Sequence, residues 1–484
     1  MRNISLALAI WVLSLSVSYA QPLQLAHIFT DHAVLQQETT APVWGWGKPG
    51  APVQVSGSWN GKAVKTTVAQ DGSWRVSLET AQADGKAYTL TVKSGKESLT
   101  VNDVVFGEVW LCSGQSNMQM PLSGFGFQRV AEGMDAILNA QATASKIRVF
   151  DIRTDRCTEP IKDVEAQWNY STPSVAAGTS AVAYFFAHRL AQNLDVPVGI
   201  IVNPWGGSRI EPWMTWEAIE GAGLTQEELA AIHAIDEKPD WPWPETPEHI
   251  WNGRVKPIAG YAAKGIIWYQ GCSNINQRYC YDKLQKAMVE LWRKEWGRDL
   301  PFIYTLLAPY THDDANGRWR PFFVLNQLHT QEILTNSWAV CAETLGDETT
   351  IHPAQKRPIG DMMCQRALQN VYGVNPGMCI ELPRVQSIEY LEDGRVKVLL
   401  TNVWSNLMDI TSRDIKGFEL AGEDRTFHLA QAQVDWDGQT IYVQCPEVPQ
   451  PVAVRYSFRN WMGANLETAY GIPVPPFKSD DWED

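Results

Sequence analysis

Residues 104–118 read VVFGEVWLCSGQSNM, an apolar run that ends in a cluster of small and polar residues. The first eight residues are typical of a buried β-strand. A serine just past a strand end, among small residues, can present its hydroxyl at the edge of the sheet, as a nucleophilic serine must. We therefore take Ser116 as a candidate nucleophile, although a polar turn with a surface serine would also explain residues 114–116 taken alone.

Beyond this strand, residues 104–375 alternate between strand and helix patterns. The alternation is typical of a parallel sheet with helices on both faces, so we predict an α/β domain. An acidic segment followed by a proline-rich one, 225–250, is predicted to be an insertion. The strands are predicted at 104–112, 146–152, 197–205, 264–270, 301–308 and 337–345, and the helices at 181–194, 279–296, 320–335 and 355–372.

The regions on either side of this domain have the pattern of antiparallel β-structure. Residues 21–103 alternate like short strands around turns such as Asn60-Gly61 and Asp71-Gly72, which predicts an N-terminal β-sandwich-like domain. Strand patterns return in residues 376–484 around turns such as Asp437-Gly438, which predicts a C-terminal β-region. A chain of 484 residues is long enough for these three units.

The first twenty residues have the pattern of a secretory signal peptide. Arg2 precedes an apolar stretch over 6–17, and residues 18–20 (SYA) form a small-residue cleavage site. The apolar stretch is too short to span a bilayer. We therefore expect residues 1–20 to be removed and the mature protein to be exported, periplasmic or extracellular, without membrane contact. The sequence does not define its oligomeric state.

Charge and cysteine usage exclude several kinds of partner. The formal net charge of −14 makes nucleic acid an unexpected partner. The eight cysteines contain no Cys-x-x-Cys pair, and the chain has no His-x-x-x-His pair, so no metal site or cofactor is predicted. An even number of cysteines permits disulfides in an exported protein but does not define their pairing.

Polar clusters follow four of the predicted strands, where ligands bind to parallel α/β sheets. They are residues 114–117, 206–209, 271–274 and His352-Pro353. Ester hydrolysis needs a serine nucleophile, a histidine base and donors for the developing oxyanion, and these clusters supply all three. Each cluster alone resembles an ordinary strand-to-helix turn, but four on one edge indicate a hydrolase site.

The motifs GQSNM, GGSRIEPWM, WYQGxSN and IHPxxK, in this order, resemble the sialate O-acetylesterase family, a branch of the SGNH-hydrolase superfamily. The similarity continues at residues 29–36, 43–47, 252–253, 307–310 and 473–477 and covers essentially the whole chain after residue 20. The resemblance implies an SGNH-hydrolase-like, flavodoxin-like α/β fold. It also implies a serine esterase that removes acetyl groups from an O-acetylated carbohydrate.

Position by position, the resemblance implies that Ser116 is the nucleophile and that His352 is the general base, which later protonates the leaving alcohol. The oxyanion hole would consist of the Ser116 backbone N–H group, the N–H group of a glycine of the Gly206-Gly207 pair, with Gly207 preferred, and the Asn274 side chain. Four further residues are expected to contact the substrate: Gln115, Arg209, Trp213 and Gln270. For Arg209 the alternatives are pairing with a substrate carboxylate or with Glu211.

Two positions depart from the family pattern. Cys272 stands where the family motif WYQGESN has glutamate, and Thr349 and Thr350 stand where an aspartate often precedes the histidine. Asp347 and Glu348 lie slightly farther upstream, so the sequence does not identify the acid that orients His352. Loss of such an acid costs about 10³–10⁴-fold in serine hydrolases, although a backbone carbonyl can orient the imidazole instead.

Several alternatives therefore stay open. Cys272 could itself be a nucleophile, a buried thiol or a disulfide partner of Cys280. Trp241 and Trp243 could stack against sugar rings or simply anchor their loop. Residues 312–314 (HDD) could be a metal or acid/base cluster, a part of the substrate rim or a solvated turn.

The substrate is also open at this stage. Sialic acid is what the family name implies, and its carboxylate requires a cation, for which Arg209 is the candidate. Acetylated xylan or another plant polysaccharide needs no such cation. A third hypothesis is a carbohydrate-binding protein on a catalytically weakened esterase scaffold, which Cys272 and the missing acid favour.

Overall fold

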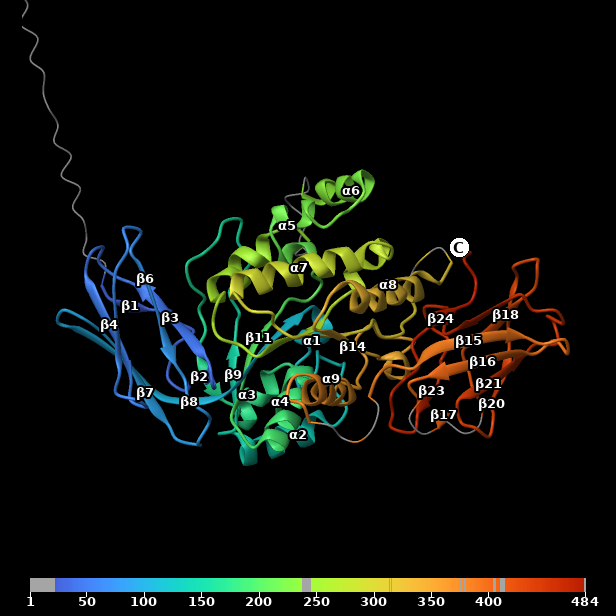
Figure 1. Cartoon of the computed structure of the whole chain (residues 1–484), viewed down its shortest axis with the longest axis horizontal. Coiled ribbons are helices and arrows are strands. Elements are labelled where there is room, and N and C mark those ends of the chain that lie inside the picture. Colours follow the sequence, from blue (N-terminus) through green and yellow to red (C-terminus); the bar gives the residue numbers. More distant parts are fainter. Residues whose placement is uncertain are drawn as a thin grey trace, which may run out of the picture.

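The structure is a computed structural model that describes residues 22–236, 245–312, 314, 316–374, 377, 380–403, 406–409 and 414–482. The predicted signal peptide, 1–20, lies outside the described residues, as do Trp241, Trp243 and Asp313. Figure 1 shows a central α/β unit between two regions of β-structure, one from each end of the chain. The predicted fold class is confirmed.

Six parallel strands form the middle of the molecule. Their spatial order is β9 (Ile147–Asp151), β11 (Val198–Pro204), β8 (Glu97–Gly114), β12 (Gly265–Tyr269), β13 (Phe302–Thr305) and β14 (Ser337–Val340). β10 (Trp168–Tyr170) extends the sheet beyond β9 in the antiparallel direction. All predicted strands and helices of this unit are present, and their ends differ most at β8, which begins at Glu97.

Helices cover both faces of these parallel strands (Figure 1). One face carries α7 (Tyr281–Trp296) and α8 (Trp319–Ile333), and the other carries α4 (Ala181–Leu194) and α9 (Arg357–Asn370). Each pair of helices packs against the sheet through its own apolar core. Parallel strands need such cover on both faces, because their connections place helices there.

β8 changes character along its length because its two halves have different surroundings. Its first residues alternate between exposed and buried positions and pair antiparallel with β7 (Tyr88–Ser94). Every residue from 104 to 114 is buried, between the parallel neighbours β11 and β12. This second half therefore has the continuous apolar sequence of a strand that is covered on both faces.

The N-terminal β-region is joined to the central sheet through β8. β4 (Pro52–Gly57) pairs with β5 (Ala63–Thr67) and with β7, and β7 pairs with the first half of β8. β2 (Val34–Gln36) pairs with the middle of β8. A second antiparallel sheet consists of β1 (Gln24–Leu25), β3 (Thr40–Trp46) and β6 (Ser73–Glu79).

Asp103 marks the point where β8 passes from one surrounding to the other. Its φ of 53° is in the left-handed region, which aspartate tolerates better than most residues. Its carboxylate accepts hydrogen bonds from Tyr170 (2.5 Å) and Arg148 (3.1 Å) and lies 2.6 Å from His32 Nδ1. Although burial acts to raise it, these contacts lower the pKa of Asp103. The carboxylate thus links the N-terminal region to β9 and β10.

The C-terminal β-region is also confirmed. It contains one antiparallel sheet of β15 (Arg384–Tyr390), β16 (Val396–Thr401), β21 (Thr440–Gln444) and β20 (Gln431–Val434). A second consists of β19 (Phe427–Leu429), β18 (Phe418–Ala421), β22 (Ala453–Tyr456) and β24 (Phe477–Lys478), and β17 (Leu407–Asp409) pairs with β23 (Leu466–Thr468). The two four-stranded sheets share one apolar core.

The C-terminal region is fixed to the α/β unit by buried polar contacts. Glu343, just after β14, accepts hydrogen bonds from Arg320 of α8 and from Ser457. Asn460 accepts from the Arg320 backbone N–H at 3.0 Å. Because Glu343 precedes the loop that carries His352, these contacts with the C-terminal region hold the start of that loop in place.

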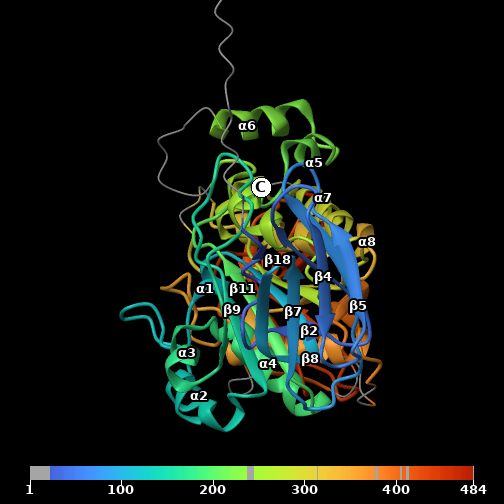
Figure 2. The ribbon, with the colours of Figure 1, turned by 90° about the vertical axis from the view of Figure 1, so that its left-hand side faces the viewer.

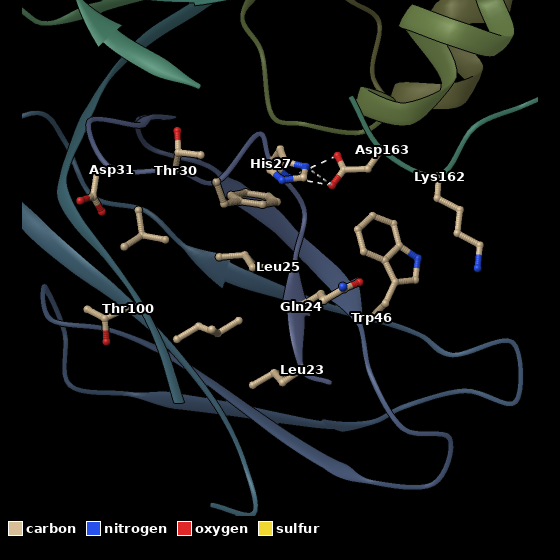
Figure 3. A pocket seen from close by; sticks show the side chains of 13 residues that line it. Leu23, Gln24, Leu25, His27, Thr30, Asp31, Trp46, Thr100, Lys162 and Asp163 are labelled. Carbon is tan, nitrogen blue, oxygen red and sulfur yellow. Dashed lines mark hydrogen bonds and ion pairs between the residues drawn. The ribbon is translucent and has the colours of Figure 1, made fainter. Parts of the chain in front are cut away.

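A cavity of about 560 Å³ lies in the N-terminal region, between β1, the end of β3 and the first half of β8 (Figure 3). His27 Nδ1 lies 2.8 Å from Asp163 Oδ2 beside it. Thr100 on its wall precedes Ser116 by 16 residues along the chain, most of them in β8. At the rise of a strand this is about 50 Å, so the cavity is remote from the carboxyl edge of the sheet.

The acidic part of the predicted insertion forms α6 (Gln226–Asp236), on the outer side of α5 (Trp216–Glu220) and α7 (Figures 1 and 2). No helix in the described part of the chain combines the length and the apolar character needed to cross a membrane. Nor do the described residues bring together three side chains that could hold a metal ion.

The contacts of Asp103 generate a stability prediction. Asp103→Asn keeps a residue that tolerates the left-handed conformation but removes the charge that compensates Arg148, whose side chain is 4% exposed. We expect the free energy of unfolding to fall by about 1.5–3 kcal/mol, measured by denaturant unfolding followed by circular dichroism.

Asp195→Asn is the matched control. Asp195 is also left-handed, with φ 54°, and pairs with Lys146 at 2.5 Å, but its side chain is 85% exposed. An exposed pair of this kind contributes at most about 1 kcal/mol. Equal losses in the two variants would show that Asp103 does not hold the junction.

Candidate active site

Ser116 lies at the turn between β8 and the short helix α1 (Ser116–Gln119), as the sequence predicts. The turn requires glycine at position 114, where φ is 139° and a Cβ atom would lie 2.3 Å from the carbonyl oxygen of Tyr269. Gln115 donates its backbone N–H to the same carbonyl at 3.0 Å. The turn is thus held against the end of β12, with Ser116 only partly buried.

His352 lies in the loop between β14 and α9 and contacts Ser116 directly. The distance between His352 Nε2 and Ser116 Oγ is 2.8 Å, although the two residues are 236 positions apart. Asn117 donates from Nδ2 to the Ile351 carbonyl at 3.0 Å and accepts from Lys356 Nζ at 2.5 Å. The residue after the serine therefore holds the histidine loop in place at two points.

Gln128 occupies the position of the acid that the sequence does not identify. Its Oε1 lies 3.0 Å from His352 Nδ1, and its Nε2 donates to Thr350 Oγ1 at 3.0 Å. Thr350 Oγ1 in turn accepts from the His352 backbone N–H at 3.2 Å. An amide oxygen can only accept, so this contact places the proton on Nδ1 and leaves Nε2 free to accept from the serine hydroxyl.

Neither upstream acid contacts the imidazole. Asp347 Oδ1 accepts from the backbone N–H groups of Thr349 (2.8 Å) and Thr350 (3.2 Å), which lowers the pKa of Asp347 and caps the turn before His352. Glu348 is exposed and lines a different cavity. The only ring against the imidazole in the described residues is that of Phe125, edge-on at 5.4 Å between centroids.

Burial and a neighbouring cation hold His352 in its neutral form. Burial, and secondly the charge of Lys356, lower the pKa of His352 to about 4. Burial also lowers the pKa of Lys356 to about 7. With no carboxylate on Nδ1 to stabilise the imidazolium, His352 is ready to accept a proton at neutral pH, but it is a weaker base than an ordinary histidine.

The backbone N–H groups that are candidates for the oxyanion hole differ in whether another group already uses them. Gly206 packs beside the serine, because a Cβ atom on it would lie 3.5 Å from Ser116 Cβ. The Gly206 N–H donates to Gln119 Oε1 at 2.9 Å, so it is already used. Within the described residues, the N–H groups of Ser116 and Gly207 donate to no other group. This arrangement favours Gly207 over Gly206 as the second donor.

The third predicted donor, Asn274, is fully buried in a polar network. Its Nδ2 donates to Glu211 Oε2 at 2.9 Å and to Gln277 Oε1. Its Oδ1 accepts from the Ile210 N–H at 3.0 Å and from Gln270 Nε2 at 2.7 Å. Both amide hydrogens are therefore used within the protein, and its oxyanion role stays a prediction that would require one of these bonds to open.

The residues expected to contact the substrate are buried instead. Arg209 forms an ion pair with Glu211 at 3.0 Å, the structural alternative named above, and only 6% of Arg209 is exposed. Trp213 is completely buried, with its ring 5.4 Å from that of Trp268. Trp213 has no exposed surface for a substrate, and Arg209 lines a cavity of about 550 Å³ whose wall includes neither Ser116 nor His352.

Gln115 and Gln270 are buried as well and connect the loops of the site. Gln115 Oε1 accepts from the Gly271 N–H at 2.8 Å. Gln270 Nε2 donates to the Ser208 carbonyl at 3.0 Å, and its Oε1 accepts from Tyr281 at 2.6 Å. Their amides therefore fix the three motif loops relative to one another, and their expected contact with substrate does not fit this burial.

Cys272 is a free thiol and is not bridged to Cys280, and all seven described cysteines are unpaired. Burial raises the pKa of Cys272 to about 12. A protonated thiol is a poor nucleophile, so this environment does not favour Cys272 as an alternative to Ser116.

His312 is also held neutral, because burial, and secondly Arg320, lower its pKa to about 4. Asp314 caps the following turn by accepting from backbone N–H groups.

A cavity of about 420 Å³ lies close to the Ser116–His352 pair, although neither of these two residues lines it. Gln119, in the same helix as Ser116, and Phe125, whose ring meets His352, both lie on its wall. Gln119, Phe125 and Gln128 were not predicted from the sequence. Gln128 lies in a loop without a recognisable motif, 224 positions from its partner, and glutamine is not a residue type that suggests this role.

The comparisons with known proteins agree with one another. Residues 106–369 match the family model described as a carbohydrate esterase, sialic acid-specific acetylesterase. The chain is 26% identical to the sialate O-acetylesterase of Homo sapiens, over 94% of this chain and 92% of that protein. The enzyme of the same name from Rattus norvegicus is 25% identical, over 98% of both chains.

A solved structure extends this similarity to three dimensions. The carbohydrate acetylesterase from Xanthomonas citri superposes with a TM-score of 0.82 and is 30% identical. The match covers 95% of this chain and all of that one. It therefore includes the N- and C-terminal β-regions as well as the α/β unit.

The low pKa of His352 predicts an unusual pH dependence. The imidazole accepts a proton only when neutral, so kcat/KM should stay level below the ordinary histidine pKa of 6.5 and fall only near pH 4. In Gln128→Glu the added carboxylate stabilises the imidazolium and should move this fall about 1–3 pH units higher. The measurement is kcat/KM for an aryl acetate as a function of pH. An unchanged profile in Gln128→Glu would contradict the contact with Nδ1.

Removal of the orienting amide gives a second prediction. Gln128→Ala leaves Nδ1–H without its acceptor, so we expect kcat for an aryl acetate to fall about 5- to 100-fold with little change in KM. Gln167→Ala is the control, because Gln167 is an exposed glutamine whose side chain hydrogen-bonds, within the described residues, only to Asn169. A kcat equal to that of Gln167→Ala would show that the amide does not position the base.

Proposed function

The chain belongs to the carbohydrate esterase family of sialic acid-specific acetylesterases, and on this basis we propose that it removes O-acetyl groups from sialic acids through Ser116 and His352. Family membership makes it an ester hydrolase of acetylated carbohydrate. The observation that carries the catalytic proposal is the 2.8 Å contact between Ser116 Oγ and His352 Nε2 at the carboxyl edge of the sheet.

The proposed reaction has two halves. Ser116 Oγ attacks the acetyl carbonyl while its proton passes to His352 Nε2. The resulting imidazolium gives this proton to the oxygen of the leaving sugar, which departs as a free hydroxyl and leaves an acetyl-enzyme. Water then attacks the acetyl group with His352 again as base, and acetate leaves as Ser116 regains its proton.

The negative charge of each tetrahedral intermediate would be stabilised by the Ser116 and Gly207 N–H groups. Both are free of other partners within the described residues, and backbone donors need no reorganisation as the charge develops. In its protonated form Lys356 acts in the same direction, because its charge favours an anion near His352 over an additional cation. No metal or cofactor is needed for these steps.

Three further points complete the proposal. Sialic acid as the sugar is supported by the description of the family model and by the names of the mammalian relatives. Export is supported by the signal-peptide pattern of residues 1–20. An active enzyme, rather than a weakened binding scaffold, is supported by Gln128, whose amide oxygen gives His352 Nδ1 an acceptor without an acid.

The test is acetate release from a panel of acetylated sialosides, xylans and pectins. We expect release from the sialosides, and a loss of at least about 10³-fold in kcat/KM in Ser116→Ala. Ser174→Ala, at an exposed serine of α3 (Pro173–Gly178), serves as the control and should match the unaltered protein.

Each other result has a definite meaning. Release from xylan alone would replace sialic acid by a plant polysaccharide as substrate. Sugar binding without acetate release from any member of the panel would replace the enzyme by a binding protein. Equal rates for Ser116→Ala and the unaltered protein would remove Ser116 as the nucleophile.

A further inference from the structure

The cavity of about 420 Å³ near the catalytic pair has a buried arginine on its wall. Gly206 packs against Ser116, and Trp205, the residue before it, lies on the cavity wall. The guanidinium of Arg254 lies over the Trp205 ring, 4.7 Å from its centroid, and Arg254 lines the same cavity. Arg254 also donates to the carbonyl of Pro204 at 2.8 Å, at the carboxyl end of β11. The cation is thus fixed at the same sheet edge as the nucleophile.

The local fold holds Arg254 in this position. It belongs to a π-helical turn, Trp251–Val255, a rare conformation that is frequent at functional sites. Gly253 allows the turn to pack closely, because a Cβ atom on it would lie 2.3 Å from the Asp155 carbonyl oxygen. A second donor of Arg254 reaches the Ile152 carbonyl at the end of β9. Only 5% of Arg254 is exposed.

Arg254 differs from most buried cations because no carboxylate pairs with it. Within the described residues, no Asp or Glu oxygen lies within 4.0 Å of its guanidinium, and its Nε is buried without a partner. Burial lowers the pKa of Arg254 to about 10, although Asp151 and Asp155 act to raise it from a greater distance. A buried and unpaired charge is costly, and an anionic ligand would compensate it.

A second arginine lies at the rim of this cavity. Arg153 pairs with Asp151 at 2.8 Å, and its side chain is 74% exposed. The charged residues on the wall are Asp151, Arg153 and Arg254, so the cavity has one positive charge in excess. The aromatic rings of Phe125 and Trp205 complete the wall. Aromatic faces beside a cation suit a ligand that combines apolar C–H surface with a carboxylate.

A competing cationic cavity lies on the opposite side of the site. It has a volume of about 590 Å³ and includes Arg318 and Arg459 at the C-terminal β-region. These arginines already share a buried carboxylate, because Glu419 accepts from Arg459 and lies 4.0 Å from Arg318. A ligand carboxylate would have to compete with Glu419 there, whereas Arg254 has no such competitor.

We propose that the cavity beside Ser116 binds the carboxylate of an acidic sugar, with Arg254 as the buried cation and Arg153 as the cation at the rim. This inference rests on the proposed function and assigns to Arg254 the role in carboxylate recognition that the sequence suggested for Arg209. The acetyl group reacts at Ser116 while the sugar ring lies against Phe125 and Trp205. The arginines thus select a sugar with a negative charge, although they do not contact the acetyl group that reacts at Ser116.

The experiment compares two substrates that differ in one charge. These are O-acetylated N-acetylneuraminic acid and its C1 methyl ester, with acetate release measured for each. We expect Arg254→Met and Arg153→Gln to lower kcat/KM for the acid about 10- to 100-fold and to change that for the methyl ester less than about threefold. The preference of the unaltered protein for the acid should disappear in both variants.

Arg395→Gln is the matched control for the exposed arginine. Arg395 also pairs with an aspartate two residues earlier, Asp393, at 2.8 Å, but it lies in the C-terminal region away from the site. Arg459→Gln tests the competing cavity. We expect both variants to keep the preference of the unaltered protein for the acid. If Arg254→Met fails to fold, Arg153→Gln still tests the cavity, because that side chain lies at the surface.

The remaining outcomes separate this inference from the proposed function. Equal kcat/KM for acid and methyl ester in the unaltered protein would overturn the carboxylate site and leave the esterase intact. Loss of the preference in Arg459→Gln, with both cavity variants unaffected, would transfer the site to the other side. Release of acetate from neither sialate substrate by the folded protein would overturn the proposed function together with this inference.

Discussion

The whole molecule depends on β8, a strand that must satisfy two different environments. Its first half has one face exposed and pairs with β7, and its second half is buried on both faces among parallel neighbours. The change occurs at Asp103, whose left-handed backbone and hydrogen bonds hold the two halves together. Because Ser116 lies two residues after the end of this strand, the packing of the sheet determines the position of the proposed nucleophile.

At the carboxyl edge of the sheet, side-chain amides orient the histidine and hold the loops, a role that carboxylates have in many serine hydrolases. Gln128 orients His352, Asn117 holds the histidine loop, and Gln115 and Gln270 connect the strand-end loops. An amide can fix the tautomer of an imidazole as well as a carboxylate can, since either accepts from Nδ1–H. It cannot stabilise the imidazolium by charge, and the pKa of His352 therefore stays low.

The sequence was informative wherever a local pattern determines the structure. The continuous apolar run before Ser116 predicted a strand buried on both faces, and the polar residues after four strands were predicted to meet at one edge, as Ser116 and His352 do. Contacts made by side chains without a motif could not be predicted, and Gln128 and Arg254 are the main examples. Arg209 and Trp213 show the converse. Their place in a motif suggested contact with the substrate, but Arg209 is paired with Glu211 and Trp213 is completely buried.

The two departures from the family pattern have a common electrostatic effect. Cys272, at the position of a glutamate in the family motif, is a neutral thiol because burial raises its pKa to about 12. The second departure, threonines at 349 and 350 in place of an aspartate, leaves the neutral amide of Gln128 as the partner of His352. Lys356 has an amide oxygen of Asn117 as its partner rather than a carboxylate, and burial together with the charge of Lys356 lowers the pKa of His352. A cation that disfavours the imidazolium would also favour the oxyanion of the proposed reaction. The same charge therefore makes His352 a weaker base and stabilises the tetrahedral intermediate.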